Sequence, residues 1–207
     1  AFVKRCDVIV HLAAMNRHPD PRVIRNTNIQ LVKQLIEVME REGVTPHVLF
    51  SSSIQEEKDN EYGKSKREGR ALLEEWARRN GASFTGMVVP NVYGPFGRPN
   101  YNSFVATFCY KLTHGEIPKV LQDGNVKLIH VESLCNHVLG KIQEIKEGNR
   151  SMVECDEVPW DFEKKVTEIL ALLENYKELY FDKGIIPFDN TVKRGYLPYN
   201  TTNVSFI

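Results

Sequence analysis

The sequence lacks the features that mark several large classes of protein. Its 207 residues include four cysteines, with no C-x-x-C pair and no histidine at a zinc-ligand spacing, so we expect reduced thiols and no metal site. It contains no signal peptide and no apolar run long enough to cross a bilayer, which predicts a cytoplasmic chain without a membrane partner. The 27 basic residues balance the 27 acidic ones, so the overall charge predicts no nucleic-acid partner.

The sequence does contain an alternation of strand-like and helix-like segments. Short apolar runs, β-branched or aromatic in character, lie at residues 8–13, 47–51 and 84–89. Between them, segments 28–42 and 62–80 carry apolar residues at helical spacing, and Gly43 and Gly81 fall where each helix should end. This order predicts an α/β fold with right-handed crossovers, that is, a Rossmann-like, doubly wound parallel sheet.

The second half of the chain has a different texture. Residues 90–103 form a loop rich in proline, glycine and asparagine. Helical patterns follow at 104–113, 132–147 and 162–177, before a turn-rich tail at 194–207.

Polar residues follow the ends of the predicted strands, which is where ligands of open α/β sheets bind. Three serines, residues 51–53, end the second strand, and Tyr62 and Lys66 then stand one helical turn apart. A free phenol has a pKa of about 10, and a nearby lysine cation is expected to lower it. Because the intervening loop returns to the same sheet edge, Ser53 should lie beside Tyr62. The pair could then polarise a carbonyl, with Tyr62 as general acid or base.

A Y-x-x-x-K spacing also occurs by chance on exposed helices, so the spacing alone is weak evidence. Here the pair opens a helix that follows a buried strand ending in serines, within a parallel α/β pattern. That setting is the one the chemistry needs, and it favours a catalytic role.

Several motifs in order along the chain resemble the extended short-chain dehydrogenase/reductases. They are HLAA at 11–14, Asn28, SSS at 51–53, YGKSK at 62–66 and PNVYGP at 90–95. The segments SSSIQ, DNEYGKSK and PNYNSFVATFCYKL are similar to the reductase half of the bifunctional capsular-polysaccharide enzymes. Those enzymes make the nucleotide-activated precursor of N-acetyl-L-fucosamine.

The resemblance implies roles for individual residues. The implied catalytic residues are Ser53, Tyr62 and Lys66, with Lys66 also reaching the nicotinamide ribose of NADP or NAD. The implied cofactor-binding residues are Leu12, Ala13, Ala14, Asn28, Ser51, Lys66, Pro90, Asn91 and Val92. The implied substrate-binding residues are Asn16, Arg17, Asn91, Asn100 and Asn102. Loop capping is an equally weighted alternative for these asparagines.

The function implied is NAD(P)-dependent reduction of a UDP-linked 4-keto-6-deoxy-hexosamine at C4, carried out by a homodimer. Residues 1–115 would form the C-terminal part of a dinucleotide-binding domain, and residues 116–207 a small substrate-binding portion with the tail. Two alternatives stay open. One is a sugar-nucleotide 4-epimerase or dehydratase, which shares the triad, and the other is a non-catalytic dinucleotide-sensing or scaffold protein with the same fold.

The chain departs from the family pattern at three places. Val88 stands where many extended members carry an arginine, and HVES at 130–133 replaces the usual Y-V-x-D segment. No G-x-x-G-x-x-G segment is present, so the first strands and the glycine-rich loop are expected to precede Ala1. From this we expect the isolated chain to lack reductase activity and to bind NADPH weakly.

Overall fold

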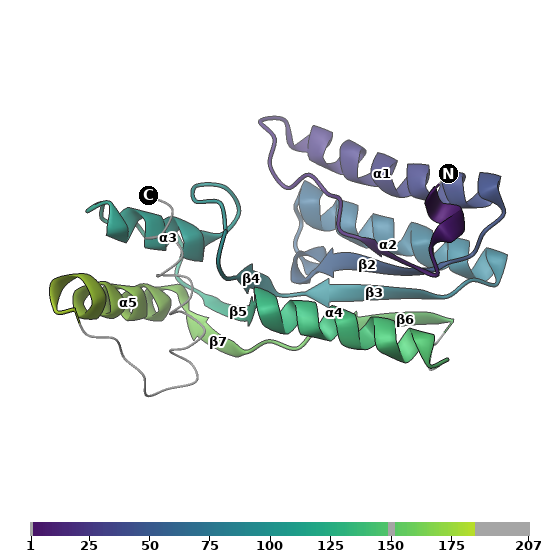
Figure 1. Ribbon diagram of the computed structural model, residues 1–207. Helices are drawn as coiled ribbons and strands as arrows, with labels where there is room; N and C mark the ends of the chain where they lie inside the picture. Colours follow the sequence, from purple (N-terminus) through teal and green to yellow (C-terminus); the bar gives the residue numbers. More distant parts are fainter. Residues whose placement is uncertain (1, 149–151, 185–207) are drawn as a thin grey trace. The chain divides into compact units, whose positions relative to one another are not determined.

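The computed structural model describes residues 2–148 and 152–184, and these fall into two compact units (Figure 1). The first unit draws on residues 1–89 and 137–158, and the second on residues 90–136 and 159–207. The predicted functional division after residue 115 stays a prediction.

The first unit is built around a parallel sheet of four strands in the order β1-β2-β3-β6. These strands are β1 (Val8–His11), β2 (His47–Ser53), β3 (Phe84–Val89) and β6 (Val153–Glu157). The connecting helices are α1 (Pro21–Glu42) and α2 (Glu61–Asn80), with short 3-10 turns η1 (Phe2–Arg5) and η2 (Ile54–Glu57). The predicted Rossmann-like α/β class is therefore confirmed.

Local sequence explains where the two long helices begin and end. Helix α1 begins earlier than the apolar spacing predicted, because Asp20 caps it and Pro21 occupies its first position. Asn60 caps α2 by accepting a hydrogen bond from the backbone N–H of Gly63 at 2.7 Å. Both helices end at the predicted glycines, Gly43 and Gly81, which adopt left-handed backbone angles.

Helices α1 and α2 lie side by side on one face of this sheet (Figure 1). The core between them and the sheet contains Val32, Met39, Val48, Phe50, Leu73, Trp76 and Phe84. On β6, Val153 packs against this core, so the alternate residues Glu154 and Asp156 face the other side of the sheet. There they contact α4 (Val131–Lys146), through Lys141 and His137 respectively.

Among the described residues, the second unit contains a three-stranded sheet, two α-helices, the π-helical turn η3 (Glu178–Asp182) and the start of α4. Strand β5 (Asn125–His130) pairs parallel with β4 (Asn91–Tyr93) and antiparallel with β7 (Phe162–Lys165). Helices α3 (Phe104–Thr113) and α5 (Val166–Lys177) supply most of the core, together with Tyr93 and Leu128.

Three predictions of secondary structure were wrong in part. The predicted loop at 90–103 contains β4, the predicted helix at 162–177 begins as β7, and strands β5 and β6 were not predicted. All four strands are short, and β6 and β7 are also rich in charged residues, so their local signal is weak and their pairing partners define them. The predicted tail at 194–207 lies outside the described residues.

The described residues contain neither a membrane-spanning helix nor a cluster of metal ligands. Among their helices, none combines the length and the apolar character that a bilayer crossing requires. In the same ranges, no three side chains of histidine, cysteine, aspartate or glutamate gather as a metal site would need.

Candidate active site

The three serines at the end of β2 have three different roles. Ser51 Oγ donates to the carbonyl of His11 at 3.3 Å and so ties the ends of β2 and β1 together. Ser52 points to the opposite face of the strand, where its hydroxyl donates to the carboxylate of Glu56. Ser53 caps η2 by accepting from the backbone N–H of Gln55 at 3.2 Å. A capping hydroxyl accepts with its oxygen, so the Ser53 hydrogen stays available for a ligand.

Lys66 is the most buried charged group of this region, with 3% of its surface exposed. Its Nζ donates to the backbone carbonyl of Ser51 at 2.7 Å. The same nitrogen lies 5.0 Å from the ring centre of Phe50 and 5.7 Å from that of Tyr62. Lys66 is thereby fixed at the carboxyl end of β2, beside the ring of Tyr62, as the sequence predicted.

Burial determines the protonation of both groups. Desolvation lowers the pKa of Lys66 to about 8, although Glu56 opposes this shift. Desolvation also raises the pKa of Tyr62 above its ordinary value. The sequence-based expectation that the pKa of Tyr62 is lowered is therefore wrong for this structure, because burial of the phenol raises it.

Gly63, the residue after Tyr62, lets two backbone segments come unusually close. A Cβ at this position would overlap the carbonyl oxygen of Gln55, and would lie 2.9 Å from its carbonyl carbon and 3.1 Å from Lys58 O. Glycine therefore permits η2, which begins after Ser53, to contact the first turn of α2, which carries Tyr62. Because the contacted atoms are all backbone, a side chain could be accommodated only by moving η2.

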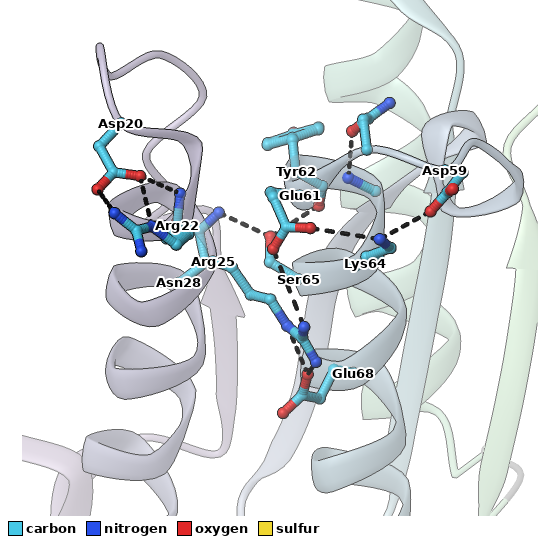
Figure 2. A network of polar contacts seen from close by, with 12 residues as sticks. Asp20, Arg22, Arg25, Asn28, Asp59, Glu61, Tyr62, Lys64, Ser65 and Glu68 are labelled. Atoms are coloured by element: carbon cyan, nitrogen blue, oxygen red, sulfur yellow. Dashed lines mark hydrogen bonds and ion pairs between the residues drawn. The ribbon is translucent and has the colours of Figure 1, made fainter.

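Asn28 connects α1 to this turn (Figure 2). Its amide exchanges two hydrogen bonds with the backbone of Met15, at 2.6 and 2.9 Å, and donates to Ser65 Oγ at 2.9 Å. Ser65 Oγ in turn donates to the carbonyl of Tyr62 at 2.7 Å. Both amide hydrogens of Asn28 are thus engaged within the protein, and the residue orients Tyr62 through Ser65. Its implied contact with a cofactor stays a prediction.

A second set of contacts in Figure 2 joins α1 and α2 at the surface. Arg25 of α1 donates to Glu68 at 2.7 Å and lies 3.9 Å from Glu61, the residue before Tyr62. Lys64 pairs with Glu61 at 3.3 Å and with Asp59 at 2.7 Å. These partly exposed pairs add little stability individually, but together they restrain the first turn of α2.

The segment after β1 contains the other predicted residues of the first unit. Leu12, Ala13 and Ala14 are exposed directly after the strand, as ligand-contacting residues at a strand end should be. Asn16 is half-buried, and its Oδ1 is a buried atom without a hydrogen bond among the described residues. Arg17 is exposed.

The remaining predicted residues belong to the second unit. Pro90 is buried, Val92 is 37% exposed, and Asn91 Nδ2 donates to the carbonyl of Lys127 at 3.2 Å. Asn100 has a left-handed backbone and its N–H donates to Thr107 Oγ1, while Asn102 is exposed. The Asn100 geometry fits the loop-capping alternative.

Three residues near the predicted triad were not predicted from the sequence as part of the site. Phe50 lies under the Lys66 ammonium, and His11 contacts Phe50 with ring centres 5.5 Å apart and the rings tilted by 40°. Burial, and then the nearby Lys66 charge, lower the pKa of His11. Glu56 lies in η2 and is 8% exposed. His11 could have been found from the sequence because it belongs to the HLAA motif. No local sequence pattern indicates a role for Glu56, because its role depends on partners elsewhere in the chain.

The residues present fit a nicotinamide cofactor. Among the described residues, the Lys66 ammonium donates one hydrogen bond, and an ammonium has three donors, so two can serve the hydroxyls of a ribose. The exposed alanines after β1 leave a surface that a flat or extended ligand can approach closely.

Comparisons with known proteins agree with this geometry. Residues 1–153 match the model of the NAD dependent epimerase/dehydratase family. The chain is 30% identical over 178 residues to a UDP-2-acetamido-2,6-beta-L-arabino-hexul-4-ose reductase of Pseudomonas aeruginosa, covering 85% of this chain and 46% of the relative.

Solved structures give the same result. The capsular polysaccharide assembling protein CapF of Staphylococcus aureus is 29% identical with a TM-score of 0.73, and the match covers 96% of this chain and 52% of CapF. The Bordetella bronchiseptica enzyme WbmF in complex with NAD+ is 15% identical with a TM-score of 0.77 over 96% of this chain and 72% of WbmF, a likeness of fold. The chain thus spans about half the length of its reductase relative and of CapF.

The match of the family model over most of the chain, the Rossmann-like sheet and the arrangement of Tyr62 and Lys66 lead to one conclusion. The chain belongs to the NAD dependent epimerase/dehydratase family, within the extended short-chain dehydrogenase/reductases and near the capsular-precursor enzymes, and NAD or NADP is the cofactor of that family.

Proposed function

We propose that this chain carries the catalytic residues of a sugar-nucleotide reductase, which reduces a UDP-linked 4-keto-6-deoxy-hexosamine at C4 during polysaccharide precursor synthesis. The observation that carries the proposal is the similarity to a UDP-hexul-4-ose reductase over 85% of this chain. The likeness to CapF, named a capsular polysaccharide assembling protein, supports the pathway class.

The protonation of the triad suits reduction of a ketone. A reduced nicotinamide, when bound, supplies the hydride that C4 accepts. Tyr62, whose pKa is raised by burial, keeps its proton at neutral pH and can give it to the carbonyl oxygen as the C4 alkoxide develops. The Ser53 hydroxyl donates a second hydrogen bond to that oxygen, and the ketone leaves as a secondary alcohol.

Lys66 has two roles in this scheme, one toward the Tyr62 phenolate and one toward the cofactor ribose. Its ammonium, buried beside the Tyr62 ring, stabilises the phenolate that remains after proton transfer. Its free donors hold ribose hydroxyls and so orient the cofactor. Leu12, Ala13, Ala14, Asn28 and Ser51 are the proposed cofactor contacts of the first unit, and Pro90, Asn91 and Val92 those of the second. Asn16, Arg17, Asn91, Asn100 and Asn102 are proposed for the UDP-sugar.

A 4-epimerase or dehydratase is the second candidate, because the matching family is named for those reactions. The same tyrosine and lysine would serve, but the hydride taken up by the cofactor would return to the sugar, so no cofactor would be consumed. A non-catalytic role for the fold is the third candidate.

One assay distinguishes the three. The protein at its natural length is incubated with NADPH and a UDP-linked 4-keto-6-deoxy-hexosamine, and NADPH oxidation and the configuration at C4 are followed by absorbance and NMR. We expect stoichiometric NADPH loss and a C4 alcohol. Conversion without net NADPH loss would favour the epimerase or dehydratase, and no conversion of any UDP-hexose would favour the binding protein.

A homodimer in the cytoplasm is part of the proposal. Helices α1 and α2 bound a groove with an apolar floor that includes Ile36 and Leu72 and a charged rim that includes Lys33, Glu37 and Arg79. Leu31 and Leu72 are half-buried and can contribute to such an interface, whereas Trp76 is 1% exposed and belongs to the core.

A further inference from the structure

Beneath η2 the first unit contains a buried carboxylate that the reaction scheme does not use. Arg70 of α2 binds the carboxylate of Glu56 with two nitrogens, Nε at 3.0 Å and Nη2 at 2.8 Å. Ser52 of β2 donates its hydroxyl to the same carboxylate. Glu56 is 8% exposed, so these bonds are largely shielded from water. The Glu56 side chain therefore connects η2 to β2, which ends at Ser53, and to α2, which carries Tyr62.

Arg70 is itself held in one position. Its Nη1 donates to Glu74 at 2.6 Å, one turn further along α2. Its aliphatic stem crosses β3 at Gly86, the only glycine of that strand, where an added Cβ would lie 2.5 Å from Cδ. The sheet thus leaves a notch for this arginine, and the guanidinium has little freedom to follow a moving Glu56.

We propose that the Glu56–Arg70 ion pair is a positioning device, which holds η2 against the first turn of α2 and thereby sets where the Ser53 hydroxyl lies relative to Tyr62. The inference rests on the proposed roles of Ser53 and Tyr62. Arg70 and Glu56 touch neither substrate nor cofactor in this scheme.

The physical reason lies in the shortness of η2. This turn has four residues, and its internal support includes the bond from Lys58 N–H to Gln55 O at 2.9 Å. Ser53 begins the turn and Glu56 stands three residues later. Removing the arginine would leave a buried carboxylate without its cation, and such a group moves toward water. Because Gln55 and Glu56 are covalently close to Ser53, the serine would move with them, and small displacements of a catalytic group slow reactions strongly.

The test compares Arg70→Met with Lys141→Met. Lys141 lies on α4 in the same unit and is also ion-paired, with Glu154 at 2.9 Å, but on the other face of the sheet. In the protein at its natural length, we expect Arg70→Met to lower kcat by about 10- to 100-fold with the KM for NADPH within about twofold. We also expect the Lys58 amide to exchange with solvent at least about tenfold faster. Lys141→Met should leave all three quantities near the parental values.

A double-mutant cycle separates positioning from general destabilisation. If Arg70 acts through Ser53, adding Arg70→Met to Ser53→Ala should lower kcat by less than about twofold further. A merely structural role would multiply the two losses, and that result would overturn the inference. So would an Arg70→Met protein with unchanged kcat and unchanged Lys58 exchange.

Two further outcomes have a defined meaning. If Arg70→Met does not fold, Glu56→Gln with Arg70→Met removes both charges, so that no buried charge is left unpaired. That double variant should fold and still show the loss of kcat and the faster exchange, and parental values would overturn the inference. The parental protein could turn over no UDP-4-keto sugar while Arg70→Met still speeds exchange of the Lys58 amide. That result would overturn the proposed function but support the claim that the ion pair fixes the position of η2.

Discussion

Replacing Gly63 by alanine should move Ser53 away from Tyr62, the proposed catalytic pair, without changing either side chain. The methyl group would point at the backbone of η2, overlapping Gln55 O and lying 2.9 Å from the Gln55 carbonyl carbon. Ordinary contact between two carbons begins at about 3.5 Å, so this carbonyl must retreat by more than about 0.6 Å. The new methyl group cannot avoid Gln55 by shifting toward Lys58, because the Lys58 carbonyl oxygen would lie only 3.1 Å from it.

The expected cost follows from this geometry. Forcing one extra methyl into a packed site costs about 1–3 kcal/mol. Alanine has a higher helix propensity than glycine, which stabilises a helix interior by about 1 kcal/mol. Gly63 lies in the first turn of α2, so this stabilisation is smaller here and offsets only part of the cost. We therefore expect a net loss of about 2 kcal/mol in the free energy of unfolding. For a chain of this length the melting temperature should fall by roughly 4–8 °C.

Gly140→Ala is the matched control. Gly140 lies inside α4, and an added Cβ there meets nothing within 4 Å, so this change should stabilise the protein slightly. Thermal unfolding by circular dichroism measures both variants, and kcat should fall for Gly63→Ala alone because η2 carries the capped Ser53. If Gly63→Ala raised the melting temperature as Gly140→Ala does, the close approach of η2 and α2 would be refuted.

Four further predictions follow from the site. Tyr62→Phe should lower kcat about a hundredfold or more with little change in NADPH affinity, and a near-parental rate in a UDP-4-keto-sugar assay would contradict the acid role. NMR titration of Lys66 should give a midpoint at about 8. Since a free lysine titrates at about 10.4, the unfolded state binds more protons between these values, so the contribution of Lys66 to stability should rise with pH across that window. A Lys66→Met reference isolates the contribution, and a midpoint above about 10 would argue against burial. Light scattering of the natural-length protein should give a dimer mass, and Leu72→Glu should shift it toward a monomer; a parental monomer at micromolar concentration would count against the interface. Finally, a fluorescence titration of the 207-residue chain should show NADPH affinity weaker than micromolar, because it contains no G-x-x-G-x-x-G segment.

Much of the first unit could be predicted from the sequence because its signals are local. The helix ends at Gly43 and Gly81 depend on a backbone angle that glycine adopts without strain, and the structure has both. Tyr62 and Lys66 lie together because they are one turn apart on a helix. The family motifs likewise lie in continuous segments, and the match of residues 1–153 to the family model confirms the family that they indicate.

Other features depend on which segments meet in space, and these only the tertiary structure decided. Strand β6 is a strand because it pairs with β3, although its sequence, VECDE, is mostly charged or polar. The pKa of Tyr62 is raised rather than lowered, since desolvation depends on everything packed around the phenol and not on the spacing to one lysine. Glu56 and Arg70 stand 14 residues apart, where no periodicity links them, and they meet because β2, η2 and α2 fold back over the notch at Gly86. The sequence by itself thus determined the family, the fold class and the proposed triad, while long-range packing determined the protonation of that triad and the contacts that hold it.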